Sequence, residues 1–157
     1  MLLRVIAVGT RMPAWVDAAV EDYSRRLRGA WRLELSALSP SSRRQAGGAA
    51  IAAKASEARR ILALLSARDL VVPLDERGEQ FSTLELAQWL EARRSEGRDL
   101  AFVIGGPDGL SDEVLARGRL HWSLSRLTLP HALVRVVLAE QLYRASTVLA
   151  GHPYHRS

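Results

Sequence analysis

The chain has 157 residues, with 22 lysines and arginines against 17 aspartates and glutamates, so its net charge is +5. Hydrophobic residues make up 48% of the chain and charged residues 25%, values that are typical of globular proteins and argue against disordered, collagen-like and coiled-coil chains. This length predicts a single domain over residues 1–157. The absence of cysteine excludes disulfides, thiolate zinc sites and cysteine nucleophiles.

The sequence carries no signal for a membrane or for export. No stretch approaches the roughly 18 consecutive apolar residues of a membrane helix. The opening Met-Leu-Leu-Arg-Val-Ile-Ala-Val has an early charge and lacks the long apolar region and small-residue cleavage site of a secretory signal. We therefore expect a cytoplasmic protein with no membrane partner.

The first quarter of the chain predicts a strand, a helix and a second strand. Leu2–Val8 is a short, β-branched apolar run, and apolar residues recur at helical spacing over 13–27. Apolar and polar residues alternate over 31–37, which is the period of a half-buried strand. Residues 39–48, rich in serine, arginine and glycine, predict a flexible loop.

An alanine-rich helix and an apolar strand are expected next. Residues 49–67 place apolar side chains, beginning with Ile51, on one helical face. Residues 70–74 form an unbroken apolar run. Pro73 lies within that run, which indicates either that the strand ends early or that it has a free edge.

The pattern of strand and helix then repeats. Ser82 and Glu85 form a capping box that starts a helix to about Glu96. Residues 100–104 are again apolar throughout. Strands of this kind that alternate with helices predict an α/β fold, with a parallel sheet covered by helices on both faces.

The C-terminal segment holds the whole charge excess. After Glu113 there are six arginines and all four histidines, against the single acid Glu140. This asymmetry favours an anionic partner such as a nucleic acid. The alternative is composition alone, because the chain has one lysine, Lys54, among its 22 basic residues, and charge runs are usually solvated surface.

Two segments near the end of the predicted sheet have the character of ligand loops. Gly-Gly-Pro-Asp-Gly at 105–109 follows a strand and precedes a short helix capped by Ser111, so it is either a ligand loop or a tight turn. It matches neither the Walker loop nor the dinucleotide fingerprint. Residues 124–129, between Trp122 and a long helix that begins at Pro130, predict a buried connection or a short strand whose backbone groups an adenine ring could satisfy.

The tail 152–156 gathers two imidazoles, a phenol and a guanidinium. These groups suit proton transfer and the binding of nucleotide oxygens. The alternative is a frayed terminus without a role. No metal-ligand spacing, carboxylate pair or Ser/His/Asp arrangement is present in the sequence.

Four segments together carry a family resemblance: 5–13, 104–111, 122–145 and 152–156. In these segments the chain resembles the RlmH family, the large-subunit rRNA pseudouridine N3-methyltransferases of the SPOUT class. The likeness spans nearly the full chain and is most specific in its C-terminal half. Residues 39–60 carry no motif that matches and add nothing to the assignment.

The resemblance implies a SPOUT-type α/β domain whose C-terminal chain forms a deep trefoil knot, an exception to unknotted connections. It further implies a homodimer with an active site completed across the interface, no metal, and 23S rRNA of the assembled ribosome as substrate. The cofactor would be S-adenosyl-L-methionine, bound in the knot. The implied cofactor contacts are Leu74, Gly105, Leu124, Ser125, Arg126, Leu127, Thr128 and Leu129.

The implied reaction needs a base, because the imide nitrogen N3 of pseudouridine is a poor nucleophile until it loses its proton. We expect His155 to be that base, Arg156 to hold an oxygen or phosphate, and Tyr154 to stack on or hydrogen-bond the base. Arg144 would contact RNA, contact the cofactor carboxylate, or pair with Glu140. Two other functions fit the sequence: a non-catalytic RNA- or ribosome-binding protein, and a SPOUT methyltransferase for another RNA position.

Overall fold

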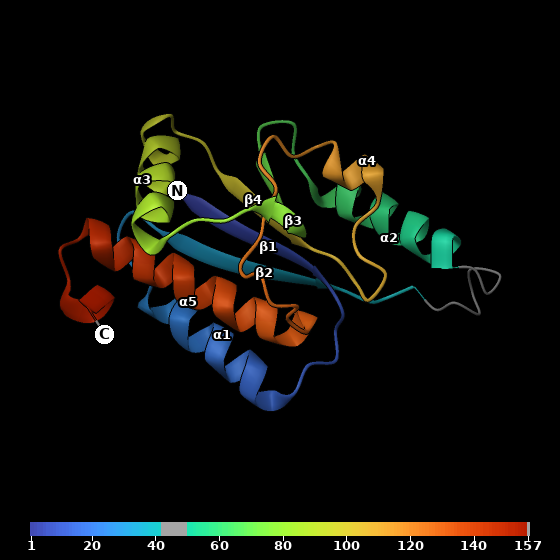
Figure 1. Ribbon diagram of the computed structural model, residues 1–157, viewed down its shortest axis with the longest axis horizontal. Helices are drawn as coiled ribbons and strands as arrows, with labels where there is room; N and C mark the ends of the chain where they lie inside the picture. Colours follow the sequence, from blue (N-terminus) through green and yellow to red (C-terminus); the bar gives the residue numbers. More distant parts are fainter. Residues whose placement is uncertain (42–49, 157) are drawn as a thin grey trace.

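The computed structural model describes residues 1–41 and 50–156. Within these residues a parallel sheet runs in the order β2-β1-β4-β3 (Figure 1). The strands are β1 (Leu2–Val8), β2 (Arg32–Leu38), β3 (Leu70–Glu79) and β4 (Leu100–Ile104). The helices are α1 (Ala14–Arg26), α2 (Ala50–Leu64), α3 (Thr83–Ser95), α4 (Asp112–Leu115) and α5 (His131–Leu149), followed by a 3-10 helix, η1 (Pro153–Arg156).

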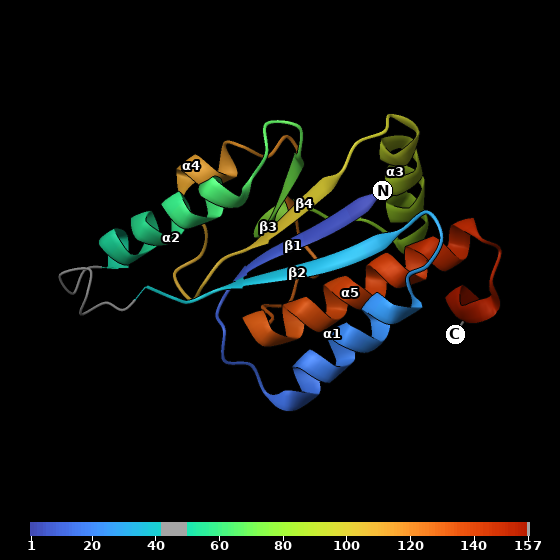
Figure 2. The same ribbon diagram turned by 180° about the vertical axis from the view of Figure 1, so that it is seen from behind.

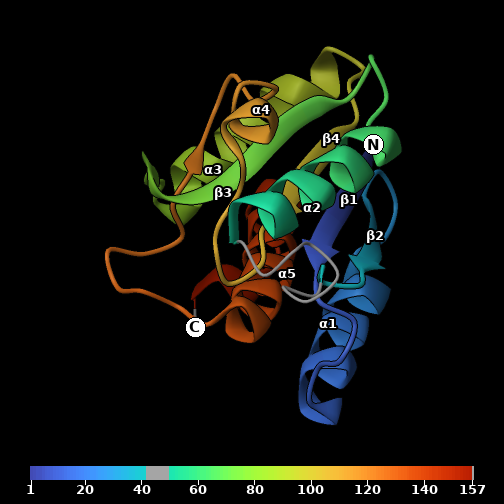
Figure 3. The same cartoon turned by 90° about the vertical axis from the view of Figure 1, so that its right-hand side faces the viewer.

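Helices cover both faces of the sheet, as the apolar strands predict. Along β1, Leu3, Val5 and Ala7 pack into a core with α1, α3 and α5. Ile6 and Val8 point the other way, into a smaller core with α2 and α4. Figures 2 and 3 show the two helical layers on either side of the strands. The predicted α/β class with a parallel sheet is therefore confirmed.

The end of β3 differs from the expectation. The strand does not stop at Pro73 but continues to Glu79, so of the two alternatives the edge position is the one observed. An edge tolerates proline because its missing N–H would not have joined a ladder. Gly118 packs so closely on the Pro73 ring that a Cβ there would lie 2.2 Å from Cδ.

Two expectations for the region before β3 have different outcomes. Ile51 was expected on the buried face of its helix but is 83% exposed, because α2 begins only at Ala50 and its buried contacts include Ala58 and Ile61. The flexible loop predicted over 39–48 falls largely outside the described residues.

The predicted start of α3 is confirmed. The Ser82 hydroxyl accepts a hydrogen bond from the Glu85 amide at 3.3 Å, and the Glu85 carboxylate accepts one from the Ser82 amide at 2.7 Å. Each bond satisfies a donor that the first turn of a helix would otherwise leave unpaired. The helix stops before Gly97, whose φ of +68° suits glycine.

The chain passes from one helical layer to the other along the β3 edge, between α4 and α5 (Figure 1). The Glu79 amide donates to the His121 carbonyl, and the Ser123 amide donates to the Glu79 carbonyl, each at 2.8 Å. Glycine at 78 permits this contact, because a Cβ there would lie 2.5 Å from the His121 oxygen. The expected trefoil knot would include this segment between α4 and α5, and it stays a prediction.

In the described part of the chain, no helix has both the length and the apolarity to cross a bilayer. The longest helix, α5, is buried or half-buried from His131 to Val148, with Leu138 and Leu142 fully enclosed. After the C-terminal end of α5 the chain turns, and η1 packs against α5.

Candidate active site: a pocket and a distant tail

A pocket of about 570 Å³ opens at the carboxyl ends of β3 and β4. Three segments form most of its wall: 74–77 in β3, just beyond its pairing with β4, then 104–110 after β4, and much of the connection 122–131. Ligands of open parallel sheets bind at this end of the strands. The volume lies within the usual range for small-molecule sites.

Most of the predicted cofactor contacts meet in this pocket. Seven of the eight predicted contacts line it: Leu74, Gly105, Leu124, Ser125, Leu127, Thr128 and Leu129. Arg126 belongs to the same connection, but it is exposed and is not among the lining residues. The structure thus brings together residues that are up to 55 positions apart in the sequence.

The packing of neighbouring residues of the chain accounts for glycine at position 105. A Cβ there would lie 2.8 Å from the carbonyl carbon of Gly109 and 3.0 Å from the Leu110 amide nitrogen. Gly109 itself has a φ of +76°, which favours glycine. The segment is therefore both a tight turn and a wall of the pocket, so the two alternatives considered for it coexist.

The connection 124–129 is an irregular segment with spare hydrogen-bonding capacity. The Ser123 hydroxyl donates to the Ser125 carbonyl, and the Ser125 hydroxyl accepts from the Leu127 amide, both at 2.9 Å. These bonds fold the segment into a loop. Within the described chain, five amides of this segment donate to no protein group, those of Leu124, Ser125, Arg126, Thr128 and Leu129.

An acidic side chain lies in the second half of β3. The Asp75 carboxylate accepts hydrogen bonds from the Arg77 amide at 2.8 Å and from the Arg77 Nε at 3.4 Å. Burial alone would raise the pKa of the Asp75 carboxyl, but these bonds and the Arg77 charge lower the pKa overall. Asp75 is therefore an anion at neutral pH and faces the pocket in that state.

A buried arginine ties α5 to the end of β1. Arg135 is 3% exposed, and its Nη2 donates to the carbonyls of Val8 at 3.1 Å and Gly9 at 2.6 Å. Burial lowers the pKa of its guanidinium. One turn earlier on the same helix, His131 lines the pocket. In the sequence, Arg135 stands only as one of the six arginines of the basic C-terminal segment. Its spacing from Leu138 was the signal that it faces the core.

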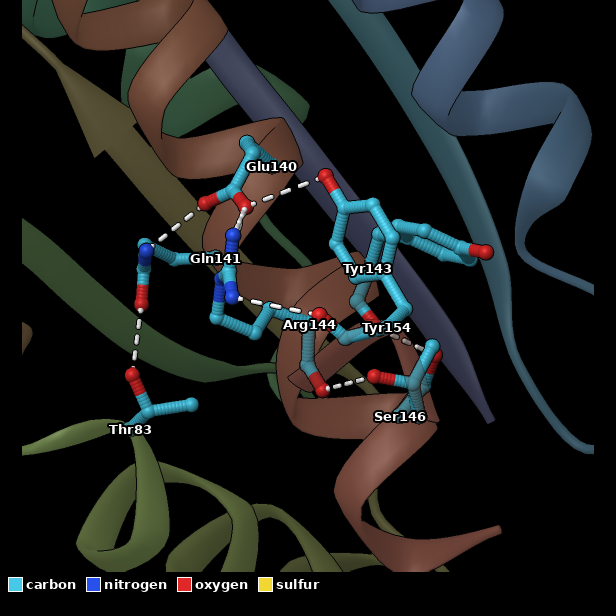
Figure 4. Close-up of polar contacts among 8 residues, drawn as sticks. Thr83, Glu140, Gln141, Tyr143, Arg144, Ser146 and Tyr154 are labelled. Carbon is cyan, nitrogen blue, oxygen red and sulfur yellow. Dashed lines mark hydrogen bonds and ion pairs between the residues drawn. The ribbon is translucent and has the colours of Figure 1, made fainter. Parts of the chain in front are cut away.

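The C-terminal tail is ordered on α5 and is not frayed. The Tyr154 ring lies 4.7 Å from the Tyr143 ring, and the Arg144 guanidinium lies 4.9 Å above Tyr154 (Figure 4). The Tyr154 hydroxyl donates to Glu140 at 3.3 Å. Burial, a hydrogen bond with Tyr23 and the Glu140 charge raise the pKa of this phenol, so it stays a donor at neutral pH.

Arg144 pairs with Glu140, which is one of the three roles the sequence left open. Its Nε donates to the Glu140 carboxylate at 2.8 Å and its Nη2 lies 2.7 Å from the same oxygen. This hydrogen bond raises the pKa of Arg144. The second Glu140 oxygen accepts from Gln141, which also contacts Thr83 of α3 (Figure 4). Glu140 thereby connects the tail to the body of the protein.

His155 has a defined tautomer. Its Nδ1 lies 2.5 Å from the His152 carbonyl oxygen. Because a carbonyl only accepts, Nδ1 carries the proton of this bond, and Nε2 of the neutral ring keeps a lone pair. A base needs such a lone pair. Arg156, the next residue, is exposed.

The tail and the pocket do not meet within one chain. The pocket lies at the start of α5 and the tail at its end, and a helix of 19 residues spans roughly 28 Å. The three predicted catalytic residues are therefore together with one another but separate from the predicted cofactor contacts. Among the residues described, no three His, Cys, Asp or Glu side chains gather into a metal-binding group.

Comparison with known protein families identifies the family of this chain. Residues 1–155 match the family model described as "Predicted SPOUT methyltransferase". The chain belongs to the SPOUT methyltransferase family. This membership confirms the resemblance and is consistent with the expected knot.

The chain is also similar over its full length to curated relatives within the family. It is 53% identical to the ribosomal RNA large subunit methyltransferase H of Thiobacillus denitrificans, over 99% of both chains. It is 51% identical to the protein of that name from Bordetella petrii, over 100% of both chains. Among solved structures, a probable methylase family protein from Haemophilus influenzae Rd KW20 covers 97% of this chain and 69% of its own, at a TM-score of 0.55. With 17% identity, that likeness concerns the fold alone.

Proposed function

We propose that this protein is an S-adenosylmethionine-dependent methyltransferase that modifies N3 of a pseudouridine in 23S rRNA, within the assembled ribosome. The observation that carries the proposal is the identity of 53% to a ribosomal RNA large subunit methyltransferase over 99% of both chains. Similarity of that extent covers nearly the whole length of the relative. The basic C-terminal segment suits an RNA substrate.

The pocket residues fit S-adenosylmethionine. The volume of about 570 Å³, the glycine wall at 105, and the unpaired amides of 124–129 suit a ligand with an adenine base and a ribose. The cofactor supplies an electrophilic methyl group on sulfur. We assign its binding to Leu74, Gly105, Leu124, Ser125, Arg126, Leu127, Thr128 and Leu129, with Arg126 acting from the rim.

The tail residues fit proton removal and charge stabilisation. His155 offers a free Nε2 to take the N3 proton, because its Nδ1 is held by the His152 carbonyl. The exposed guanidinium of Arg156 can approach a pseudouridine oxygen, where the negative charge develops. Tyr154 remains protonated and shapes the tail, since its hydroxyl is bonded to Glu140.

A homodimer resolves the separation of tail and pocket. Because about 28 Å of helix divides them in one chain, the tail of a second copy is the one that can complete a pocket. Two-fold symmetry would then create two such composite sites in each dimer. We further propose that residues 1–157 form one knotted SPOUT-type domain, and that the protein works in the cytoplasm on ribosomes.

Methyl transfer to ribosomes tests this function directly. The protein is incubated with methyl-labelled S-adenosylmethionine and either ribosomes from cells that lack the modification or purified 23S rRNA, and labelled nucleosides are then identified. We expect N3-methylpseudouridine in ribosomes and none in naked rRNA. Label in another nucleoside would identify a methyltransferase for a different RNA position. No label, despite demonstrated cofactor binding, would favour a non-catalytic ribosome-binding protein.

A further inference from the structure

The chain's single lysine lies at the pocket. Lys54 comes from the first half of α2, in the segment 39–60 that matches no motif, yet this half-buried residue lines the pocket. The proposed function gives this side chain no role. A flexible ammonium is a point charge that can follow an anionic group, unlike the rigid fork of an arginine.

Lys54 carries no counter-ion in the described structure. Glu57 lies one turn further along α2, at a spacing that allows an ion pair, but the two described side chains form none. Glu57 is instead 7% exposed, and its carboxylate accepts the Ser41 amide at 3.0 Å. The same carboxylate lies beside the glycine loop, 3.2 Å from where a Cβ of Gly106 would be. The Lys54 ammonium is thus available to an anionic group from outside the described chain.

The other charged residues of the pocket sharpen this point. Arg77 is bonded to Asp75, and its side chain is 80% exposed. Asp75, Glu76 and Asp108 contribute negative charge to the wall. A half-buried cation facing such a pocket is stabilised when a bound group brings an oxyanion to it.

We propose that Lys54 is an oxyanion-binding residue of the pocket, which recognises a carboxylate or phosphate of a bound substrate. The inference rests on the proposed function, which offers two sources for this chemistry. One is the α-carboxylate of S-adenosylmethionine, and the other is a phosphate of the incoming rRNA. Both lie on molecules that must meet at this site if methyl transfer occurs there.

Binding measurements on Lys54→Ala and Lys54→Arg test the proposal without requiring turnover. Arg59→Ala is the matched control, because it removes one positive charge from the exposed side of α2 and lies outside the pocket wall. Calorimetry with S-adenosylmethionine and with its decarboxylated analogue forms the cofactor arm. Filter binding of ribosomes that lack the modification, at several salt concentrations, forms the RNA arm. Unfolding temperatures confirm that each variant is folded.

If the carboxylate is the partner, Lys54→Ala weakens S-adenosylmethionine binding about tenfold and leaves the decarboxylated analogue unchanged. If a phosphate is the partner, ribosome affinity falls about tenfold, and the slope of log affinity against log salt decreases by about one. Lys54→Arg retains part of the affinity in either case. Equal binding by the Lys54→Ala and Arg59→Ala variants in both arms overturns the inference alone. An unaltered protein that binds neither probe overturns the proposed function together with it.

Discussion

At the scale of single residues, the chemistry of the candidate site depends on how each titratable side chain is held. The His152 carbonyl fixes the tautomer of His155, burial and contacts with Tyr23 and Glu140 keep Tyr154 a donor, and Arg77 keeps Asp75 an anion. The sequence indicated these residue types but could not predict these partners. A contact between Tyr154 and Glu140 depends on how η1 folds back on α5, which no local pattern encodes.

Replacing His155 by alanine should reduce turnover strongly and leave cofactor affinity unchanged. The loss of a positioned base costs about 10²- to 10⁴-fold in rate, whereas none of the residues assigned to the cofactor lies in the tail. Single-turnover methylation of ribosomes and calorimetry with S-adenosylmethionine measure the two quantities. Added imidazole should restore part of the rate. Near-normal turnover in the variant would remove His155 from the role of base.

Replacing Asp75 by asparagine should make stability less dependent on acid pH. The carboxyl has a pKa below its ordinary value of 3.8 in the folded protein, so its stabilising contribution is complete above that value and is lost as pH falls through the lower, folded-state pKa. The variant should lose about 1 kcal/mol near pH 7, from weakened charge-assisted bonds. Urea unfolding from pH 2 to 7 should show the two proteins converging at the acid end. A difference that is constant with pH would contradict this account.

At the scale of elements, local signals predicted most strands and helices, because each has its own pattern. The apolar runs of β1 and β4, and the Ser82 cap of α3, need no tertiary information. Tertiary packing decided the exceptions. β3 extends past Pro73 because the segment after α4 pairs with its outer edge, and Ile51 is exposed because it precedes the part of α2 that touches the sheet.

Glycine at 78 should be required for the pocket as well as for stability. A Cβ there would lie 2.5 Å from the His121 oxygen, so Gly78→Ala must push the chain around Trp122 away from β3. We expect a lower unfolding temperature and at least tenfold weaker S-adenosylmethionine binding, because Trp122 leads into the 124–129 wall. Gly29→Ala is the control, since its φ of +71° strains alanine but no atom lies within 4 Å of the new Cβ. The control should lose roughly 1 kcal/mol of stability and keep its affinity. Equal affinities in the two variants would refute the link.

At the scale of the whole molecule, the sequence indicated the residues of the pocket and of the tail but not the distance between these two sets. The residues of the pocket and those of the tail each assemble within one chain, and α5 separates the two sets by roughly 28 Å. Arg135 also belongs to this scale, since a guanidinium that holds the end of β1 to α5 is visible only after the fold has formed. The proposed homodimer, which the family resemblance implies, would bring a second tail to the pocket.

Complementation between two inactive variants tests the composite site most directly. One chain carries Leu124→Arg, which fills the pocket, and the other carries His155→Ala, which removes the tail base. Circular dichroism and calorimetry verify that both variants fold and that only the first loses cofactor binding. Equal amounts are unfolded together, refolded and assayed for methyl transfer to ribosomes. The account predicts recovery to about a quarter of the unaltered activity, because half of the dimers then hold one intact site of two. Activity no higher than that of either variant alone would contradict a site shared between pocket and partner tail.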